Sequence, residues 1–257
     1  MTGYNAWVSG GTAGIGLSTA RKLAERGATV TITGATQHRG DAAAAELRRI
    51  SPRSRFILSD ATDGVSCAAV AAAISRDLGS LDIVVSAGAP PNSQKPAPFA
   101  EMTAQQVRAG FDARLFARIL PVHAAVPHLQ RSGRGSVVMV TTDAARHPTP
   151  GESVIGAVGA AIILMTKALA RELSRDKVRV NTVALTITSG TPAWGRMFAE
   201  PGFAEKIFSK AVSRFPFGRP PHADEVAEAV AFFAGRSSGQ ITGQTLSVNG
   251  GLSYGGW

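Results

Sequence analysis

Residues 9–16 of the chain read Ser-Gly-Gly-Thr-Ala-Gly-Ile-Gly, a glycine-rich stretch between two segments of different hydrophobic pattern. The apolar run Ala-Trp-Val precedes it at 6–8, and an amphipathic stretch follows it at 17–26. This order predicts a strand, a tight turn and a helix, the arrangement in which a helix N-terminus binds the pyrophosphate of a dinucleotide. The position between a strand and a helix argues against a plain surface loop.

The glycines of this turn have separate expected roles. Gly10 permits the tight turn, Gly14 lets the backbone approach the phosphates, and Gly16 allows the helix to pack closely on the strand. The residues of the turn that we expect to bind the nucleotide are Gly10, Thr12, Ala13, Gly14, Ile15 and Gly16.

Length and composition fit one α/β domain over residues 1–257. The chain has 257 residues of which 44% are hydrophobic, enough to bury a large core. Cys67 is the only cysteine, so no intramolecular disulfide forms and a reducing compartment fits. The first strand begins near Asn5, which leaves no room for a signal peptide, and the longest apolar stretch, 154–166, is too short to span a bilayer. We expect a cytoplasmic protein with no membrane contact.

The chain carries a formal charge of +9, which raises the question of nucleic-acid binding. The basic residues are spread along the chain, and aromatic residues suited to base stacking make up only 6%. Nucleic-acid binding needs a basic footprint on one face, so we expect none. Attraction of anionic cofactors or acyl carriers is an equally good interpretation of the charge. The sequence predicts no metal site.

Strand patterns alternate with helix patterns along the chain, which predicts βαβ units and a parallel sheet. The expected strands begin near Asn5 and continue at 29–34, 55–58, 81–86, 135–141, 178–184 and 245–248. The expected helices cover 17–26, 40–50, 65–78, 103–130 and 153–174. Residues 188–219, rich in Pro, Gly and Phe, read as an irregular insertion. It follows the sixth strand, where open α/β sheets bind ligands, so it is either a lid or a surface excursion.

Five stretches, in one order along the chain, resemble motifs of the short-chain dehydrogenase/reductase family. The glycine turn is similar to Thr-Gly-x-x-x-Gly-x-Gly, with Ser9 in place of the threonine. Asp60 lies where the family's aspartate meets the adenine. The other stretches are Leu-Asp-Ile-Val-Val-Ser-Ala-Gly-Ala at 81–89, Lys-Val-Arg-Val-Asn-Thr-Val-Ala at 177–184 and Gln-Ile-Thr-Gly-Gln-Thr-Leu-Ser-Val-Asn-Gly-Gly at 240–251. The resemblance covers essentially the whole length.

The resemblance implies a single doubly wound Rossmann-type domain with a seven-stranded, mainly parallel sheet flanked by helices. It implies a nicotinamide cofactor, a small-molecule substrate and transfer of a hydride between them. It also implies a homo-oligomer, a dimer or tetramer, assembled through the helices around 103–130 and 153–174. The further cofactor-binding residues that it implies are Asp60, Ala61, Ser86, Ala87, Gly88 and Ile187.

The family's catalytic tyrosine and lysine are missing from this chain. Aligning Leu-Ala-Arg-Glu-Leu at 169–173 with the family's Leu-Ala-x-Glu-Leu puts Ile155 at the tyrosine and Gly159 at the lysine. The only tyrosines, Tyr4 and Tyr254, lie near the two ends, so no shift of register restores the motif. Loss of a general acid slows such a reaction by a factor of about 10² to 10⁴.

The same alignment changes two further positions. The family's serine becomes Thr142, which keeps a hydroxyl, and its helical asparagine becomes Arg114. Arg114 either binds an anionic substrate group or pairs with Asp112 or a phosphate. His147 is a candidate proton donor or a solvated loop histidine. It shares its loop with Asp143, Arg146 and Glu152.

Replacement of two large polar side chains predicts free space beside Ile155 and Gly159. That space either admits a bulkier ligand or is filled by Trp194 or Phe198 of the insertion. Glycine inside a helix also costs about 1 kcal/mol relative to alanine.

The end of the second strand indicates which cofactor is preferred. Residues 34–36, Gly-Ala-Thr, offer no carboxylate for the ribose hydroxyls of NAD. Thr36, His38 and Arg39 provide groups that bind a 2′-phosphate instead, so the sequence favours NADP(H) over NAD(H) modestly. The basic residue often found in related NADP-dependent reductases is Ala13 here.

Three functions remain open at this stage. The first is a divergent NADP(H)-dependent oxidoreductase with a substituted active site. The second is a non-redox enzyme, a cyclase or dehydratase, on the same fold. The third is a catalytically silent subunit of a mixed oligomer. The fold by itself does not choose between them.

Overall fold

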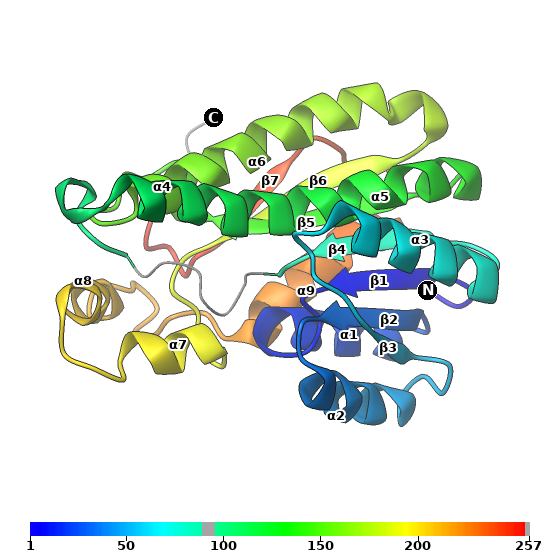
Figure 1. Cartoon of the computed structure of the whole chain (residues 1–257), viewed down its shortest axis with the longest axis horizontal. Coiled ribbons are helices and arrows are strands. Elements are labelled where there is room, and N and C mark those ends of the chain that lie inside the picture. The colour runs from blue at the N-terminus through cyan, green and yellow to red at the C-terminus, as the bar shows by residue number, and fades with distance from the viewer. Residues whose placement is uncertain (89–95, 255–257) are drawn as a thin grey trace.

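The structure, a computed structural model, describes residues 1–88 and 96–254 and consists of one twisted sheet with helices on both faces (Figure 1). All six strand pairings are parallel, and the strand order is β3-β2-β1-β4-β5-β6-β7. The order reverses between β1 and β4, which creates the crevice where such sheets bind ligands. The strands are β1 Asn5–Ser9, β2 Thr29–Gly34, β3 Arg55–Leu58, β4 Ile83–Ser86, β5 Ser136–Thr142, β6 Arg179–Leu185 and β7 Thr245–Val248. The seven-stranded parallel sheet expected from the sequence is confirmed.

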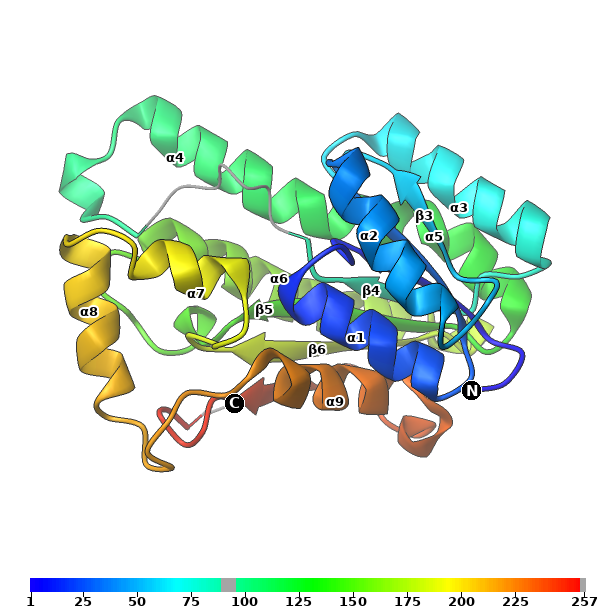
Figure 2. The same ribbon diagram turned by 90° about the horizontal axis from the view of Figure 1, so that it is seen from below.

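The helices form two layers, each with its own core. One layer contains α1, α2 and α9, which lie together in the view from below (Figure 2). The other contains α3, α5 and α6, seen above the sheet in Figure 1. The α-helices are α1 Gly14–Glu25, α2 Gln37–Arg48, α3 Gly64–Leu78, α4 Ala104–Phe111, α5 Ala117–Ser132, α6 Ser153–Glu172, α7 Pro192–Met197, α8 Phe203–Val212 and α9 Ala223–Ala234.

Strand β1 explains why the sheet needs both layers. All five of its residues are buried, with Ala6 and Val8 packed into the core under α1 and Trp7 into the core under α3. Successive side chains of a strand point to opposite faces, so a continuous apolar strand requires cover on both sides. The Trp7 indole Nε1 donates to Thr33 Oγ1 at 3.0 Å, so its one polar atom is satisfied.

The structure corrects two of the expected elements. The helix expected over 103–130 is interrupted by a π-helical turn, Asp112–Phe116, between α4 and α5. The chain on both sides of the turn stays helical, so the helix pattern of the sequence does not reveal it. Half of the 188–219 insertion is helical rather than irregular, because it contains α7 and α8, which pack around Ile187, Phe208 and Phe215.

Two further points concern a helix that the sequence did not predict and a motif residue outside the described part of the chain. Helix α9 was not among the expected helices, although its buried residues Ala223, Val226, Ala227 and Val230 recur at helical spacing and a capping box of His222 and Glu225 starts it. Ala89, the last residue of the 81–89 motif, lies outside the described residues.

Helix α6 is long and apolar, with 20 residues and a mean hydropathy of 1.9 over its best 18-residue window. By length and composition alone such a helix is able to cross a membrane. Here Val158 and Ile162 pack it onto the sheet, as in a core helix. Only 33% of that window is buried, and Leu164 on its outer side is 69% exposed.

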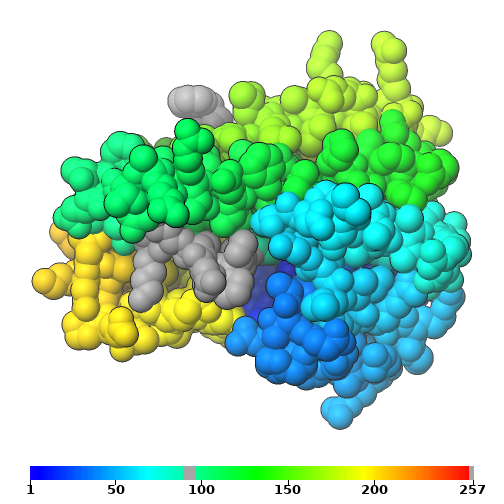
Figure 3. Space-filling view, in the orientation of Figure 1, coloured from blue at the N-terminus to red at the C-terminus, as the bar shows by residue number. Residues whose placement is uncertain are grey.

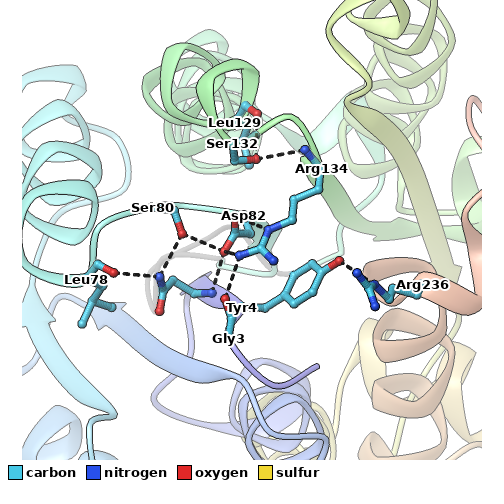
Figure 4. Close-up of polar contacts among 10 residues, drawn as sticks. Gly3, Tyr4, Leu78, Ser80, Asp82, Leu129, Ser132, Arg134 and Arg236 are labelled. Atoms are coloured by element: carbon cyan, nitrogen blue, oxygen red, sulfur yellow. Dashed lines mark hydrogen bonds and ion pairs between the residues drawn. The ribbon is translucent and has the colours of Figure 1, made fainter.

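A buried carboxylate ties the amino ends of the strands together (Figure 4). Asp82, fully buried before β4, accepts hydrogen bonds from the Asn5 backbone N–H and the Ser80 hydroxyl, both at 2.9 Å. The Arg134 guanidinium donates to both Asp82 oxygens, at 3.0 and 3.1 Å, and lies 4.2 Å from the centre of the Tyr4 ring. The segments before β1, β4 and β5 therefore share one anion.

We predict that Asp82→Ala lowers the free energy of unfolding by about 3 kcal/mol, because it leaves a buried backbone donor and an arginine without their acceptor. Asp77→Ala is the matched control, since Asp77 pairs with Arg55 and Arg76 at a partly exposed site where such pairs are worth about 0–1 kcal/mol. Urea denaturation of both variants measures the difference. Equal losses in the two variants would contradict the role given to Asp82.

Candidate active site

The glycine turn forms a surface of backbone atoms at the carboxyl end of β1. Gly10 has φ +75°, and a Cβ there would lie 2.6 Å from the Gly88 backbone nitrogen. A Cβ on Gly16 would overlap the carbonyl of Gly10. Ala13, at the N-cap of α1, provides no side-chain cap, so the N–H groups of the first turn keep their capacity for an anion. These features fit a dinucleotide pyrophosphate.

The other two expected glycine roles are modified by the structure. Gly16 packs against the turn itself, rather than only against a strand. Gly14 has φ +52°, and a Cβ there would touch Pro192 and Thr191 at 3.2 and 3.4 Å. The start of α7 therefore lies against the glycine turn, as the neighbouring α7 and α1 in Figure 2 show.

The end of β2 excludes a large side chain beside the turn. A Cβ on Gly34 would lie 2.9 Å from Thr12 Cγ2 and 3.1 Å from Thr12 Oγ1. An acidic residue at this position would therefore displace Thr12. Thr36 is the N-cap of α2 without a side-chain hydrogen bond to the helix, and Arg39 is exposed in its first turn. Thr36 and Arg39, two of the three expected 2′-phosphate ligands, thus stand at the same edge of the sheet as the glycine turn.

The remaining expected cofactor residues differ in what their side chains do. Asp60, followed by the partly buried Ala61, accepts hydrogen bonds at Oδ1 from the Thr62 backbone N–H and hydroxyl, at 2.8 and 2.7 Å. The Ala87 N–H donates to the Ser9 carbonyl at 3.0 Å, which ties β4 to the glycine turn. Ile187 is buried against Phe208 of α8. Its side chain therefore supports the 188–219 segment.

Thr142, at the end of β5, has a hydroxyl group prepared to donate. Its Oγ1 accepts a hydrogen bond from the Ala144 N–H at 3.2 Å. That bond uses an acceptor site and leaves the hydroxyl proton for another oxygen. The next residue, Asp143, is buried and accepts from the Ser247 hydroxyl and the Asn249 amide, both at 2.6 Å. The segment after β7 thereby fixes the loop that carries Thr142.

The space expected beside Gly159 does not exist, because the backbone of helix α6 lies directly against the end of β5 and the loop after it. A Cβ on Gly159 would lie 2.8 Å from Ala145 Cβ, 2.9 Å from Thr142 Cγ2 and 3.2 Å from Thr141 Oγ1. Gly156 similarly places a Cβ 2.6 Å from the Ala144 carbonyl oxygen. Two glycines one turn apart let the helix backbone approach β5 and its loop closely.

Trp194 and Phe198 pack on each other instead of filling that position. Their ring centres are 4.7 Å apart, and both join the cluster around Ile187. The tyrosines offer no replacement either. Tyr4 is buried at the amino edge of the sheet, where its hydroxyl accepts from Arg236 Nε at 3.1 Å (Figure 4), and Tyr254 is 81% exposed.

The π-helical turn places two arginines next to this site. Arg114 lies within the turn, and burial lowers the pKa of its guanidinium while the charge of Glu152 raises it. Arg118, one turn later, donates to the Arg114 carbonyl at 2.9 Å and to the Val140 carbonyl of β5 at 2.8 Å. Ser86 donates to the Arg118 carbonyl at 2.9 Å. Burial and the Arg114 charge lower the pKa of Arg118 to about 10.

Glu152 is the acidic residue that the structure adds to the site. It directly precedes α6, where its N–H donates to the Thr149 carbonyl at 3.0 Å and its own carbonyl accepts from Gly156. Burial of its carboxyl raises the pKa of Glu152 to about 7, against the opposing charge of Arg114. The sequence placed Glu152 on the loop but gave it no role. Its position three residues before Ile155 was the available signal.

His147 is half-buried on the same loop. Its backbone N–H donates to the Asp143 carbonyl at 2.9 Å, and its Nε2 is buried without a hydrogen-bond partner among the described residues. It is therefore not the fully solvated loop histidine that the sequence offered as one alternative. Within the described part of the chain, no group of three or more His, Cys, Asp or Glu residues is placed to hold a metal ion.

Comparison with known proteins agrees with this geometry. A family model described as Enoyl-(Acyl carrier protein) reductase matches residues 10–253. The chain belongs to the short-chain dehydrogenase/reductase family. Within this family it is 31% identical over 249 residues to cis-4-hydroxycyclohexanecarboxylate dehydrogenase of Sinomonas cyclohexanicum, covering 96% of each chain. Gluconate 5-dehydrogenase of Gluconobacter oxydans is 28% identical over 253 residues, covering 98% of this chain and 96% of that one.

A solved structure of this family, a short chain dehydrogenase/reductase family protein, superposes with a TM-score of 0.84 at 34% identity and covers 97% of both chains. The chain is thus an oxidoreductase of the short-chain dehydrogenase/reductase type, a family whose members use NAD(P)(H) and small-molecule substrates.

We predict that Gly159→Ala destabilises the protein although alanine is the better helix former. The propensity gain of about 1 kcal/mol is outweighed by an overpacking cost of about 1–3 kcal/mol, since the contacts of the new Cβ belong to a strand end and a short loop. Gly64→Ala in the first turn of α3 is the control, because nothing lies within 4 Å of its Cβ, and we expect a gain of up to about 1 kcal/mol. Chemical denaturation shows whether each substitution lowers or raises the free energy of unfolding. A stabilised Gly159→Ala protein would refute the close packing.

Proposed function

We propose that this chain is an NADP(H)-dependent oxidoreductase that interconverts a small alcohol and its carbonyl compound with an active site rebuilt around Thr142 and Arg114. The observation that carries the proposal is the backbone surface of Gly10, Gly14 and Gly16 behind the uncapped first turn of α1. Backbone N–H groups, and not side chains, therefore face the position that a pyrophosphate would occupy.

The residues proposed to hold the cofactor follow the carboxyl edge of the sheet. The turn at 10–16 binds the pyrophosphate through backbone N–H groups, and Asp60 with Ala61 meets the adenine. Thr36 and Arg39 bind the 2′-phosphate. The supporting observation is that Gly34 leaves no room for an acidic side chain, which would bind the ribose hydroxyls of NAD instead. The backbone at 86–88 and at Ile187 borders the nicotinamide. A bound nicotinamide supplies the hydride donor or acceptor.

The chemical roles of the chain's own residues follow from their hydrogen bonds. Thr142 donates its hydroxyl proton to the substrate oxygen, because the Ala144 N–H occupies its acceptor side. Arg114 brings a positive charge to the helix edge that borders this oxygen, where charge develops during reaction. His147 is a second candidate for proton transfer, by virtue of its buried Nε2.

We propose that the substrate carries an acid group. Two relatives are named for such compounds, gluconate and a hydroxycyclohexanecarboxylate. Arg114 and Arg118 of this chain bring two positive charges to this region, and Glu152 is the acidic group on which the charge of Arg114 acts. The excess of basic groups at the site favours an organic anion.

We further propose that residues 188–219 act as a lid. Their helices α7 and α8 stand beside the layer of α4, as the yellow and green surfaces in Figure 3 show, and the start of α7 touches the glycine turn. The segment has its own apolar cluster and joins the sheet region through a bridge between Ser189 and His222. The segment therefore moves as one rigid body over the candidate site.

The cofactor assignment predicts that NADPH binds more tightly than NADH and that Arg39→Ala weakens NADPH binding by about tenfold or more, since a charged hydrogen bond contributes about 1.5–3 kcal/mol. NADH binding stays unchanged in this variant, because NADH has no 2′-phosphate. Arg48→Ala, exposed at the other end of α2, is the matched control. Calorimetric titration measures all three proteins. No binding of either nucleotide at millimolar concentration would overturn the proposed function.

We propose that the protein is a homo-oligomer assembled through α5 and α6. The outer side of α6 exposes Leu164 on a helix whose mean hydropathy is 1.9, an apolar surface that a second copy would cover. We predict that Leu164→Glu shifts the assembly to a smaller species, because a charge would be buried in the interface. Val65→Glu is the control, since Val65 is 80% exposed on α3, outside the proposed interface. Light scattering after size-exclusion chromatography gives the masses, and a wild-type monomer would contradict the proposal.

A further inference from the structure

The absence of the family's tyrosine and lysine leaves the proposed reaction without an assigned acid or base. Among the described residues, three acidic or basic side chains lie on Thr142's loop or at its end: Glu152, His147 and Asp143. Asp143 is held by Ser247, Asn249 and Arg146 and is committed to the segment after β7. The choice therefore lies between Glu152 and His147.

We propose that Glu152 is the catalytic acid and base of this chain, the group that exchanges a proton with the substrate oxygen opposite Thr142. The inference rests on the proposed oxidoreductase function and names the residue that performs its proton transfer. No tyrosine is required.

The first argument is the face of α6 on which Glu152 stands. Residues 152, 156 and 159 are spaced i, i+4 and i+7, which places them on one side of a helix. Gly156 contacts the Ala144 carbonyl, and Gly159 contacts Thr142 itself. Glu152 is the N-cap residue directly before this stripe, and its carbonyl accepts from the Gly156 N–H, so Glu152 lies one turn from the contact between Gly156 and Ala144.

The second argument is the charge placed against it. Arg114, on the π-helical turn, is the charged residue whose field acts on Glu152 among the described residues. The positions of Arg114 and of Ile155, three residues after Glu152, are those of the family's asparagine and tyrosine. Burial and Arg114 act in opposite directions, so the pKa of about 7 allows both protonation states near neutrality.

The proton transfer balances as follows for alcohol oxidation. The carbinol carbon releases a hydride to an oxidised nicotinamide, and the hydroxyl oxygen releases its proton to a carboxylate oxygen of Glu152. The electron pair of the broken O–H bond forms the second carbon–oxygen bond of the product. The protonated Glu152 then returns its proton to water. In the reverse direction the neutral carboxyl donates the same proton.

The test compares wild type with Glu152→Gln. This substitution keeps the shape of the neutral acid but cannot give up or accept a proton near neutral pH. The control is Glu172→Gln, an exposed glutamate at the other end of α6. Oxidation of gluconate and of cis-4-hydroxycyclohexanecarboxylate with NADP⁺ is followed over pH 5 to 9. We expect kcat of Glu152→Gln to fall by about 10² or more while NADP⁺ affinity is kept, and kcat of Glu172→Gln to stay unchanged. Wild-type kcat/KM rises with pH to about 7 and then levels, since the base form is needed.

A second readout needs neither substrate nor cofactor. The folded-state pKa of Glu152 is raised from 4.5 to about 7, so the folded protein holds a proton that the unfolded chain releases in this window. Wild type therefore loses stability relative to Glu152→Gln as pH rises from 4.5 to 7, and the difference is constant above. Denaturation at pH 5 and pH 8 measures it. If wild type and Glu152→Gln differ in their free energy of unfolding by the same amount at pH 5 and at pH 8, the assignment is overturned.

The outcomes distinguish failure of the proposed function from failure of the role given to Glu152. A wild-type protein that binds NADP⁺ but oxidises neither compound would overturn the proposed function and, with it, the role of Glu152. Turnover that survives in Glu152→Gln would overturn the role of Glu152 alone. The same holds if His147→Asn, and not Glu152→Gln, removes the pH dependence.

Discussion

The close approach of the glycine turn to the end of β4 is the contact on which this structure depends. Gly10 meets the Gly88 backbone, and Gly16 meets the carbonyl of Gly10, without room for a side chain at either glycine. The Ala87 N–H donates to the Ser9 carbonyl and continues the ladder into the turn. Because β1 and β4 are the neighbours at which strand order reverses, this contact shapes the crevice and the direction of α1 together. The cofactor end of the site follows from it.

The chemical end of the site is built on a second close approach. Gly156 and Gly159 allow α6 to lie directly on Ala144, Thr142 and Ala145. A side chain at 159 would need this volume, so the structure leaves no empty space beside Gly159. A larger residue there therefore requires the helix to move outward.

The π-helical turn and the start of α5 bring two arginines to this region. Arg118 satisfies the carbonyls of Arg114 and Val140, which links the turn to β5, and Ser86 joins β4 to the same helix. The charge of Arg114 acts on a carboxyl, Glu152, whose burial favours its neutral form. The proposed proton transfer depends on this balance of burial and charge.

The sequence by itself determined the sheet, most helices and the cofactor edge of this protein. Strand and helix periodicity together with the turn at 9–16 located all seven strands, since these signals are local. The alignment also predicted Thr142 and Arg114 as site residues and predicted which of the family's side chains are absent. Only the tertiary structure decided how the absence is accommodated, because the packing of Gly159 on Thr142 joins residues 17 positions apart through the path of a helix. The π-helical turn at Arg114 and the burial of the Glu152 carboxyl are likewise properties of neighbours distant in sequence, which no local pattern records.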